Sequence, residues 1–394
     1  MTCSNDTYPQ TFSQQRPGGG NAAYLIRFET GDSDNPKNFG PLYKAWVTLV
    51  MSSMAFAGSM GSAVIAPAEP AIAAYLGLEL EPTVLTVALF VLGFAFGPLV
   101  WGPISEVYDR RWSMLPAVFA MGLCSVGTAT SRSATAICIT RFLGGVFGSA
   151  PVSNVSASLG DFYDAGTRGI AMVFVSLCII GGPTIAPVIG AAITHNPNMG
   201  WRWTEYLHAI ITFAIWAAAI IWIPETYTPV LLKRKATRMR KNMGDDRYWH
   251  PFESENMTLG NIATNYLSRP LRMLFTETMV ACMALYASFV YGILYLTLQV
   301  FPIVFMEQRN YSPVVSALPF LGLFVGATCA IPINIANQPQ YLKAVVKNGG
   351  KPVPEARLVP MLLGGVCFSV GLFWFGWTAA PEYSFALPVI ASGA

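Results

Sequence analysis

Long runs of apolar residues recur along the chain after a polar first segment. A helix needs about 20 mostly apolar residues to cross a bilayer, and nine runs approach that length. They cover residues 45–66, 83–103, 112–130, 136–158, 170–193, 206–223, 279–302, 314–336 and 358–379. A tenth run begins near Phe385 and reaches Ala394 after about half a span. The pattern predicts an all-α polytopic membrane protein with about nine and a half spans.

The connectors between these runs differ sharply in positive charge. With the N-terminus in the cytosol, the cytosolic segments hold 20 of the 24 Lys and Arg residues. The connectors on the other side hold only Arg132, Arg202 and Arg309. Because Lys and Arg concentrate in cytosolic loops, we predict a cytosolic N-terminus.

The lengths of the polar segments predict four parts. Residues 1–44, rich in Gly, Pro, Ser and Gln, are expected to form a disordered cytosolic tail. Residues 45–223 are expected to form an N-terminal six-helix bundle, and residues 279–394 a partial C-terminal helix bundle. Residues 224–278 form the longest and most basic connector, a cytosolic central loop. Its basic residues suit a solvated linker or contact with anionic lipid.

Composition narrows the class further. Only 11% of the residues are charged and 53% are hydrophobic, whereas soluble domains carry roughly 25% charged residues. We therefore expect the lipid bilayer as solvent and no nucleic-acid partner. The cysteine spacing fits neither a disulfide framework nor a metal site. His-Glu-x-x-His and Walker A patterns are missing, so we expect no cofactor and no enzymatic activity.

A few polar residues lie where burial in lipid is costly. Arg141 falls inside the span 136–158, where an arginine costs roughly 2.5–3.5 kcal/mol at a helix centre. It either anchors the helix near the interface or faces a watered cavity that handles an anion or a proton. Glu106 is expected to pair with Arg110 or Arg111 if the helix continues, or with the segment from Asp161 to Arg168. Glu69 is expected at the interface.

The span 279–302 carries a polar and aromatic stripe. Tyr291, Tyr295 and Gln299 recur at intervals of four, so they share one helix face, and Tyr286 precedes them. Tyrosine rings attract cations. These four residues are predicted to line a substrate cavity, with ordinary packing as the alternative.

Several motifs, taken in order, resemble those of fungal drug:proton antiporters of the major facilitator superfamily. Residues 102–111, Gly-Pro-Ile-Ser-Glu-Val-Tyr-Asp-Arg-Arg, match the family's loop 2–3 motif, with Asp109 where the family has glycine. Residues 141–145, Arg-Phe-Leu-Gly-Gly, resemble the span 4 motif. Residues 182–190, Gly-Pro-Thr-Ile-Ala-Pro-Val-Ile-Gly, resemble the span 5 motif of exporters. Shorter matches extend from about Asn35 to the end of the chain.

The resemblance implies roles for these residues. It assigns proton coupling to Arg141 and an inner gate to Gly102, Glu106, Arg110, Arg111, Asp161 and Arg168. It assigns the bending of span 5 to Gly182, Pro183, Pro187 and Gly190. Within the family the chain is most similar to the polyamine and multidrug branch.

These features together favour proton-coupled efflux of small molecules such as drugs, toxins or polyamines. The alternatives are facilitative or symport uptake on the same fold, an inactive truncated relative, or a membrane receptor or intramembrane enzyme. The family has twelve spans, so we expect a chain truncated at its C-terminus. We also expect a monomer whose partners are a small-molecule substrate and protons, in the plasma membrane rather than the vacuolar membrane.

Overall fold

The computed structural model describes residues 24–29, 31–253, 268–349 and 353–393. Within these ranges nine helical stretches are long and apolar enough to cross a membrane, which confirms the predicted spans. The helices that form them are α1 (Pro41–Ala63), α3 (Leu85–Val107), α4 (Arg110–Thr130), α5 (Ala134–Phe162), α6 (Ala165–His195), α7 (Arg202–Trp222), α11 (Thr278–Phe301), α13 (Pro319–Lys347) and α14 (Leu358–Thr378). The shorter helix α15 (Ala386–Gly393) corresponds to the predicted half span. Residues 1–23 of the predicted tail and residues 254–267 of the predicted central loop lie outside the described residues.

The first span is longer than predicted and is broken in the middle. After α1 the chain turns at Val64 and Ile65, forms a short 3-10 helix (Ala66–Ala68), and continues as α2 (Glu69–Leu76). Pro67 cannot donate the backbone hydrogen bond that a continuous helix requires. Gly77 ends α2 with a φ of 64°, a left-handed conformation that favours glycine. The break leaves Glu69 buried in the bundle, and its predicted interfacial depth stays a prediction.

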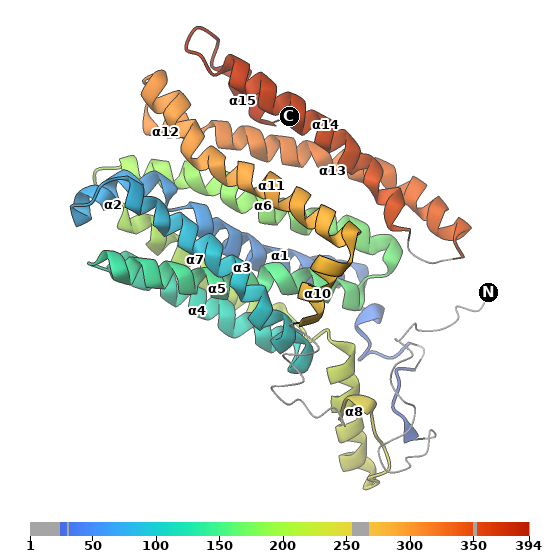
Figure 1. Cartoon of the computed structure of the whole chain (residues 1–394). Coiled ribbons are helices and arrows are strands. Elements are labelled where there is room, and N and C mark those ends of the chain that lie inside the picture. The colour runs from blue at the N-terminus through green and yellow to red at the C-terminus, as the bar shows by residue number, and fades with distance from the viewer. Residues whose placement is uncertain (1–23, 30, 254–267, 350–352, 394) are drawn as a thin grey trace.

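The helices pack in an order that places α1 and α6 at the centre (Figure 1). On one side, α3 packs on α5, and α4 packs on α5 and α7. On the other side, α13 packs along α6, and α15 packs on α13 and α14. We call α1 to α7 the first group of helices and α11 to α15 the second group. Small residues permit close contact within the first group: a Cβ on Gly93 would lie 2.3 Å from the carbonyl oxygen of Phe142, as expected for glycine at membrane helix interfaces.

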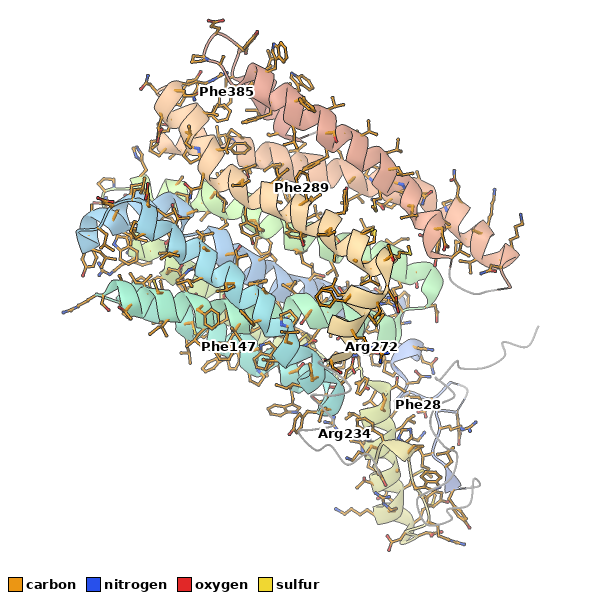
Figure 2. All side chains as sticks on the ribbon, in the orientation of Figure 1. Phe28, Phe147, Arg234, Arg272, Phe289 and Phe385 are labelled. Atoms are coloured by element: carbon orange, nitrogen blue, oxygen red, sulfur yellow. The ribbon has the colours of Figure 1, made fainter. Side chains whose placement is uncertain are left out.

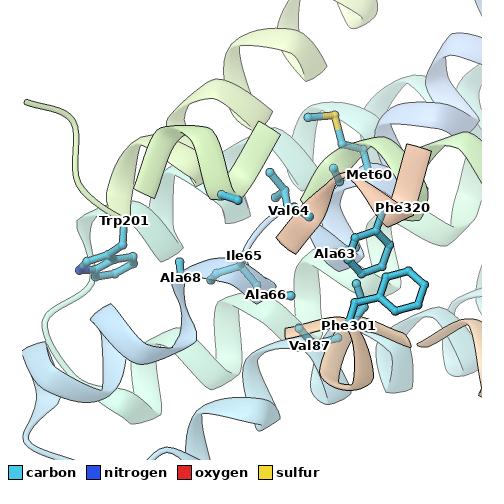
Figure 3. Close-up of a cluster of buried hydrophobic side chains, with 14 of the residues drawn as sticks. Met60, Ala63, Val64, Ile65, Ala66, Ala68, Val87, Trp201, Phe301 and Phe320 are labelled. Atoms are coloured by element: carbon cyan, nitrogen blue, oxygen red, sulfur yellow. The ribbon is translucent and has the colours of Figure 1, made fainter. Parts of the chain in front are cut away.

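Two apolar clusters hold the bundle together. One lies within the first six helices and includes Met51, Met114 and Phe162. The other joins both groups of helices at the α2 end of the bundle (Figure 3). There Met60 and Val64 of the first group share a cluster with Phe301 and Phe320 of the second. At this end, therefore, the two groups are closed against each other.

A polar appendage extends from the opposite end of the bundle, where α8 (Thr228–Met243) lies (Figure 1). We call this the α8 end; the charge pattern predicts that it faces the cytosol. The backbone of Leu25 pairs with that of Trp249, and Ile26 packs on Leu232 and Ala236. Figure 2 shows Phe28 and Arg234 within this appendage. Residues 24–29 and 31–39, which belong to the expected tail, have a defined position, with Ile26 and Phe28 packed in one apolar cluster with α8.

Candidate functional site

A buried ion pair occupies the interior of the first six helices. The guanidinium of Arg141 on α5 lies 3.0 Å from a carboxylate oxygen of Glu205 on α7, with side-chain exposures of 1% and 0%. Arg141 also donates to the carbonyl oxygens of Thr86 at 2.7 Å and Ser62 at 3.3 Å. It lies over the ring of Phe90, 4.4 Å from the centroid. Arg141 is therefore a buried charge between four helices and not an interfacial anchor.

A second buried carboxyl lies close to this pair. Glu69 is 4% exposed, and its Oε2 accepts a hydrogen bond of 3.0 Å from Nε2 of Gln299 on α11. Its charge interacts with that of Arg141. One turn earlier on α11, the hydroxyl of Tyr295 lies 2.8 Å from the Ser62 hydroxyl. Polar contacts thus connect the second group of helices directly to the buried pair.

His208, one turn after Glu205 on α7, completes the buried polar network. Its Nε2 lies 2.9 Å from the carbonyl oxygen of Ala57 and its Nδ1 lies 2.8 Å from the Ser125 hydroxyl. A neutral ring with its proton on Nε2 satisfies both contacts, because Ser125 then donates to Nδ1. His208 thereby fixes α7 against α1 and α4.

The span 5 motif brings α6 against α1. A Cβ on Gly182 would lie 2.6 Å from the backbone nitrogen of Met60, and one on Gly190 would lie 2.3 Å from the carbonyl oxygen of Val64. Pro183 and Pro187 lie inside an unbroken α6. The glycines therefore allow close helix contact beside the break in the first span. The predicted bending role of this motif stays a prediction.

At the α8 end, the loop 2–3 motif and its neighbours form a charged cluster. Arg110 lies 3.4 Å from Asp161 and donates to the Ser105 hydroxyl at 2.7 Å. The carboxylate of Glu225 accepts from the backbone nitrogens of Arg110, Arg111, Thr226 and Tyr227 at 2.7–3.2 Å. Burial raises the pKa of Glu225, and backbone donors, including Arg111 and Tyr227, oppose the rise. Glu225 therefore caps the first turn of α4 from a distant segment.

The rest of the predicted gate is arranged differently. Helix α3 ends at Val107 and Asp109 caps α4, so the helix does not continue from Glu106 to Arg110 and their predicted pair is wrong. Among the described residues Glu106 forms no ion pair. In the segment from Asp161 to Arg168, Asp161 pairs with Arg110, and Arg168 donates to the carbonyl oxygen of Ser156. Asp109 instead pairs with Arg234 of α8. Gly102 has open space beside it.

A groove of about 320 Å³ lies between α6 and α13 towards the α8 end. Its polar side chains are Ser176, Asn334, Asn337 and Gln338. The four predicted cavity residues of α11 do not line it. Tyr286 and Tyr291 are 38% and 45% exposed, while Tyr295 and Gln299 point to the first group of helices. The stripe is thus divided, and its role in substrate binding stays a prediction.

Comparison with known families identifies this fold. The family model described as Major Facilitator Superfamily matches residues 51–394. The chain belongs to the major facilitator superfamily. Members of this superfamily are transport proteins and not enzymes.

Relatives within the superfamily include named fungal efflux proteins. "Efflux pump bik6" of Gibberella fujikuroi is 38% identical over 93% of this chain and 75% of its own length. The "Major facilitator superfamily multidrug transporter FLU1" of Candida albicans is 34% identical over 98% of this chain. The chain spans 63% of the length of FLU1.

Solved structures share the major facilitator fold at low sequence identity. The xylose transporter XylE of E. coli, in a partially occluded inward open conformation, aligns with a TM-score of 0.58 at 17% identity. The alignment covers 89% of this chain and 80% of XylE. The human organic anion transporter MFSD10 aligns with a TM-score of 0.56 at 16% identity, over 90% of this chain and 83% of that protein.

Sequence reasoning missed Glu205 and His208 of the buried polar network and Glu225 of the charged cluster at the α8 end. Glu205 lies just before the predicted span 206–223, beside a run of interfacial aromatic residues, so its burial was hidden. His208 was a lone histidine without a recognisable partner pattern. Glu225 lies in the sequence Pro-Glu-Thr-Tyr at residues 224–227, one of the shorter matches to the family, to which no role was assigned. An acidic residue within one turn of a predicted span end was the available signal for Glu205 and Glu225.

Proposed function

We propose that this major facilitator transporter exports small molecules from the cytosol in exchange for protons. The Arg141–Glu205 pair carries the proposal, because a buried charge inside a membrane bundle is retained at considerable cost. The names of its relatives, an efflux pump and a multidrug transporter, support the outward direction and an amphiphilic drug-like substrate.

The coupling step follows from the chemistry of the pair. Glu205 Oε2 accepts no hydrogen bond within the described residues, so this oxygen is free to take a proton. Protonation of Glu205 would remove the charge that compensates Arg141, and an uncompensated buried charge is strongly unfavourable. The protonated protein would then prefer a conformation in which Arg141 reaches water or an anionic group. A proton shifts the conformational equilibrium only through such a difference in affinity.

Alternating access supplies the transport cycle in this proposal. The two groups of helices make contact through Ser62–Tyr295 and Glu69–Gln299 at the α2 end. The groove between α6 and α13 lies towards the α8 end. This conformation suits entry of substrate from the α8 end. The Arg110–Asp161 and Glu225 contacts would rearrange when that end closes.

The cellular setting belongs to the same proposal. We place the protein in the plasma membrane as a monomer. Its N-terminus and α8 are assigned to the cytosol, because positive charge concentrates in the appendage. A protease site introduced beside Lys241 of α8 tests the orientation in intact cells. Cleavage from outside the cells would reverse the assignment.

Transport in proteoliposomes tests the function. The chain is reconstituted and loaded with ethidium or radiolabelled spermidine, and a proton gradient is imposed. We expect the gradient to drive movement of at least one probe and a protonophore to abolish it. Glu205→Gln should lose gradient-driven movement, whereas Arg132→Lys in an exposed connector should retain it. Equal movement of the probes with and without the gradient would support facilitated diffusion and refute proton exchange.

A further inference from the structure

The buried polar network contains two carboxyl groups but one guanidinium. Arg141, Glu205 and Glu69 are 1%, 0% and 4% exposed, and the charges of both carboxyl groups interact with that of Arg141. If both carboxyl groups were ionised, the cluster would carry a net negative charge in a region without water contact. Buried charges in membrane bundles are compensated by partners of opposite sign.

The remaining titratable groups around the cluster do not supply the missing positive charge. His208 of α7 is satisfied as a neutral ring by Ala57 and Ser125. Tyr295 of α11 is uncharged and bonds to Ser62. The faces of α1 and α3 contribute the carbonyl oxygens of Ser62 and Thr86. Arg202, at the start of α7, donates to carbonyl oxygens of Ala129 and Ser131 and lies over Tyr75.

The contacts of the two carboxyl groups differ, and this difference locates the proton. Glu205 lies 3.0 Å from the guanidinium and is the direct counter-ion of Arg141. Glu69 receives a hydrogen bond only from the neutral amide of Gln299, and its Oε1 has no partner among the described residues. A carboxyl without a charged donor is the better proton acceptor of the two.

We propose that Glu69 is a second protonation site, which holds a proton while the α2 end is closed. This inference rests on the proposed proton exchange, because it assigns a second acid to the same coupling network. Loss of the proton would create a buried carboxylate without a direct counter-ion, and the cost of this burial would be relieved when Glu69 reaches water as the α2 end opens. Loss of the proton and opening of the α2 end are therefore linked, since each favours the other. In the proposed exchange this proton leaves towards the α8 end, where the substrate enters, before the α2 end opens.

Infrared spectroscopy of the chain in lipid tests the proposal without any substrate. A protonated, buried carboxyl gives a C=O stretching band at neutral pH that a carboxylate lacks. We expect Glu69→Gln to lose the absorbance of one carboxyl per molecule. Glu205→Gln should lose it as well, because Glu69 then becomes the only counter-ion of Arg141. The matched control Glu79→Gln, an exposed carboxyl on the same side, should leave the band unchanged.

Gln299→Leu locates the proton independently and guards against a Glu69 variant that fails to fold. Removal of the amide donor should shift the band while its area is kept, because Gln299 bonds to Glu69 and not to Glu205. An unchanged band in both Glu69→Gln and Gln299→Leu would overturn the proposal. Gradient-driven transport is measured separately, so a failure of proton exchange is distinguishable from a failure of this inference.

Discussion

The Glu225 carboxylate allows a quantitative test of how the α8 end is held together. Its Oε1 accepts from the backbone nitrogens of Arg110, Thr226 and Tyr227, and its Oε2 accepts from that of Arg111. Two of these donors belong to the first turn of α4, where no intrahelical acceptor exists. The other two fix the turn that leads into α8. Replacement by alanine removes all four acceptor contacts at once.

The expected loss follows from the strength of such contacts. Hydrogen bonds to charged groups contribute about 1.5–3 kcal/mol each, but water can replace some of them after truncation. We therefore expect Glu225→Ala to destabilise this region by about 3–5 kcal/mol, consistent with a lost cap and a lost charge at a helix N-terminus. Glu225→Gln keeps one oxygen and should cost about 1–2 kcal/mol, since its amide group faces the Arg111 nitrogen.

Hydrogen exchange of the first amides of α4 measures the effect locally. A loss of about 3–5 kcal/mol corresponds to exchange that is roughly 140-fold to 3,700-fold faster. Asp164→Asn is the matched control, because Asp164 precedes α6 at the same end but its side chain makes no cap hydrogen bond. The control should change stability by less than about 0.5 kcal/mol. Equal exchange rates in the alanine variant and the wild type would refute the capping role of Glu225.

Three further predictions concern other parts of the molecule. Arg141→Lys should fold but lose gradient-driven transport, because an ammonium cannot reach both carbonyl oxygens and Glu205 together. Gly182→Ala should cost about 1–3 kcal/mol in denaturant unfolding, whereas Gly364→Ala, with open space beside it, should not. Burial lowers the pKa of His250 to about 4 from its usual 6.5. The unfolded state therefore binds a proton on His250 at a higher pH than the folded state does, and the folded state loses stability as the pH drops from 6.5 to 4. Residues 24–29 pair with Trp249 beside His250, so their amide protection should fall over this range.

The spans and the importance of Arg141 could be predicted from the sequence for a simple physical reason. Lipid imposes a minimum apolar length on each helix, and a charge within such a run is conspicuous. The partner of Arg141 could not be predicted, because Glu205 on α7 comes within reach of α5 only when both helices pack against α1 and α4. Neither periodicity nor spacing encodes that packing. The break at Pro67 had the same effect on Glu69, since it turned an apparent connector residue into a buried one.

The gate illustrates a different limit of pattern reading. The structure brings Arg110 and Asp161 together, while their role in a gate stays a prediction. The assumption of a continuous helix placed Glu106 beside them, but α3 ends at Val107 and the side chain of Asp109 caps the start of α4. Where a loop motif has an aspartate in place of glycine, a helix cap is therefore an alternative to a tight turn.

The attachment of α8 determines how the chain can swing during transport. Arg234 ties α8 to Asp109, and Lys235 ties it to Asp32 of the appendage. Because of the Arg234–Asp109 bond, α8 is expected to move with the first group of helices and not to act as a flexible linker between the two groups. Any hinge between the two groups of helices must then lie after α8 in the chain. A fluorescent label on α8 would consequently report the motion of the first group of helices and would not report motion of the second group.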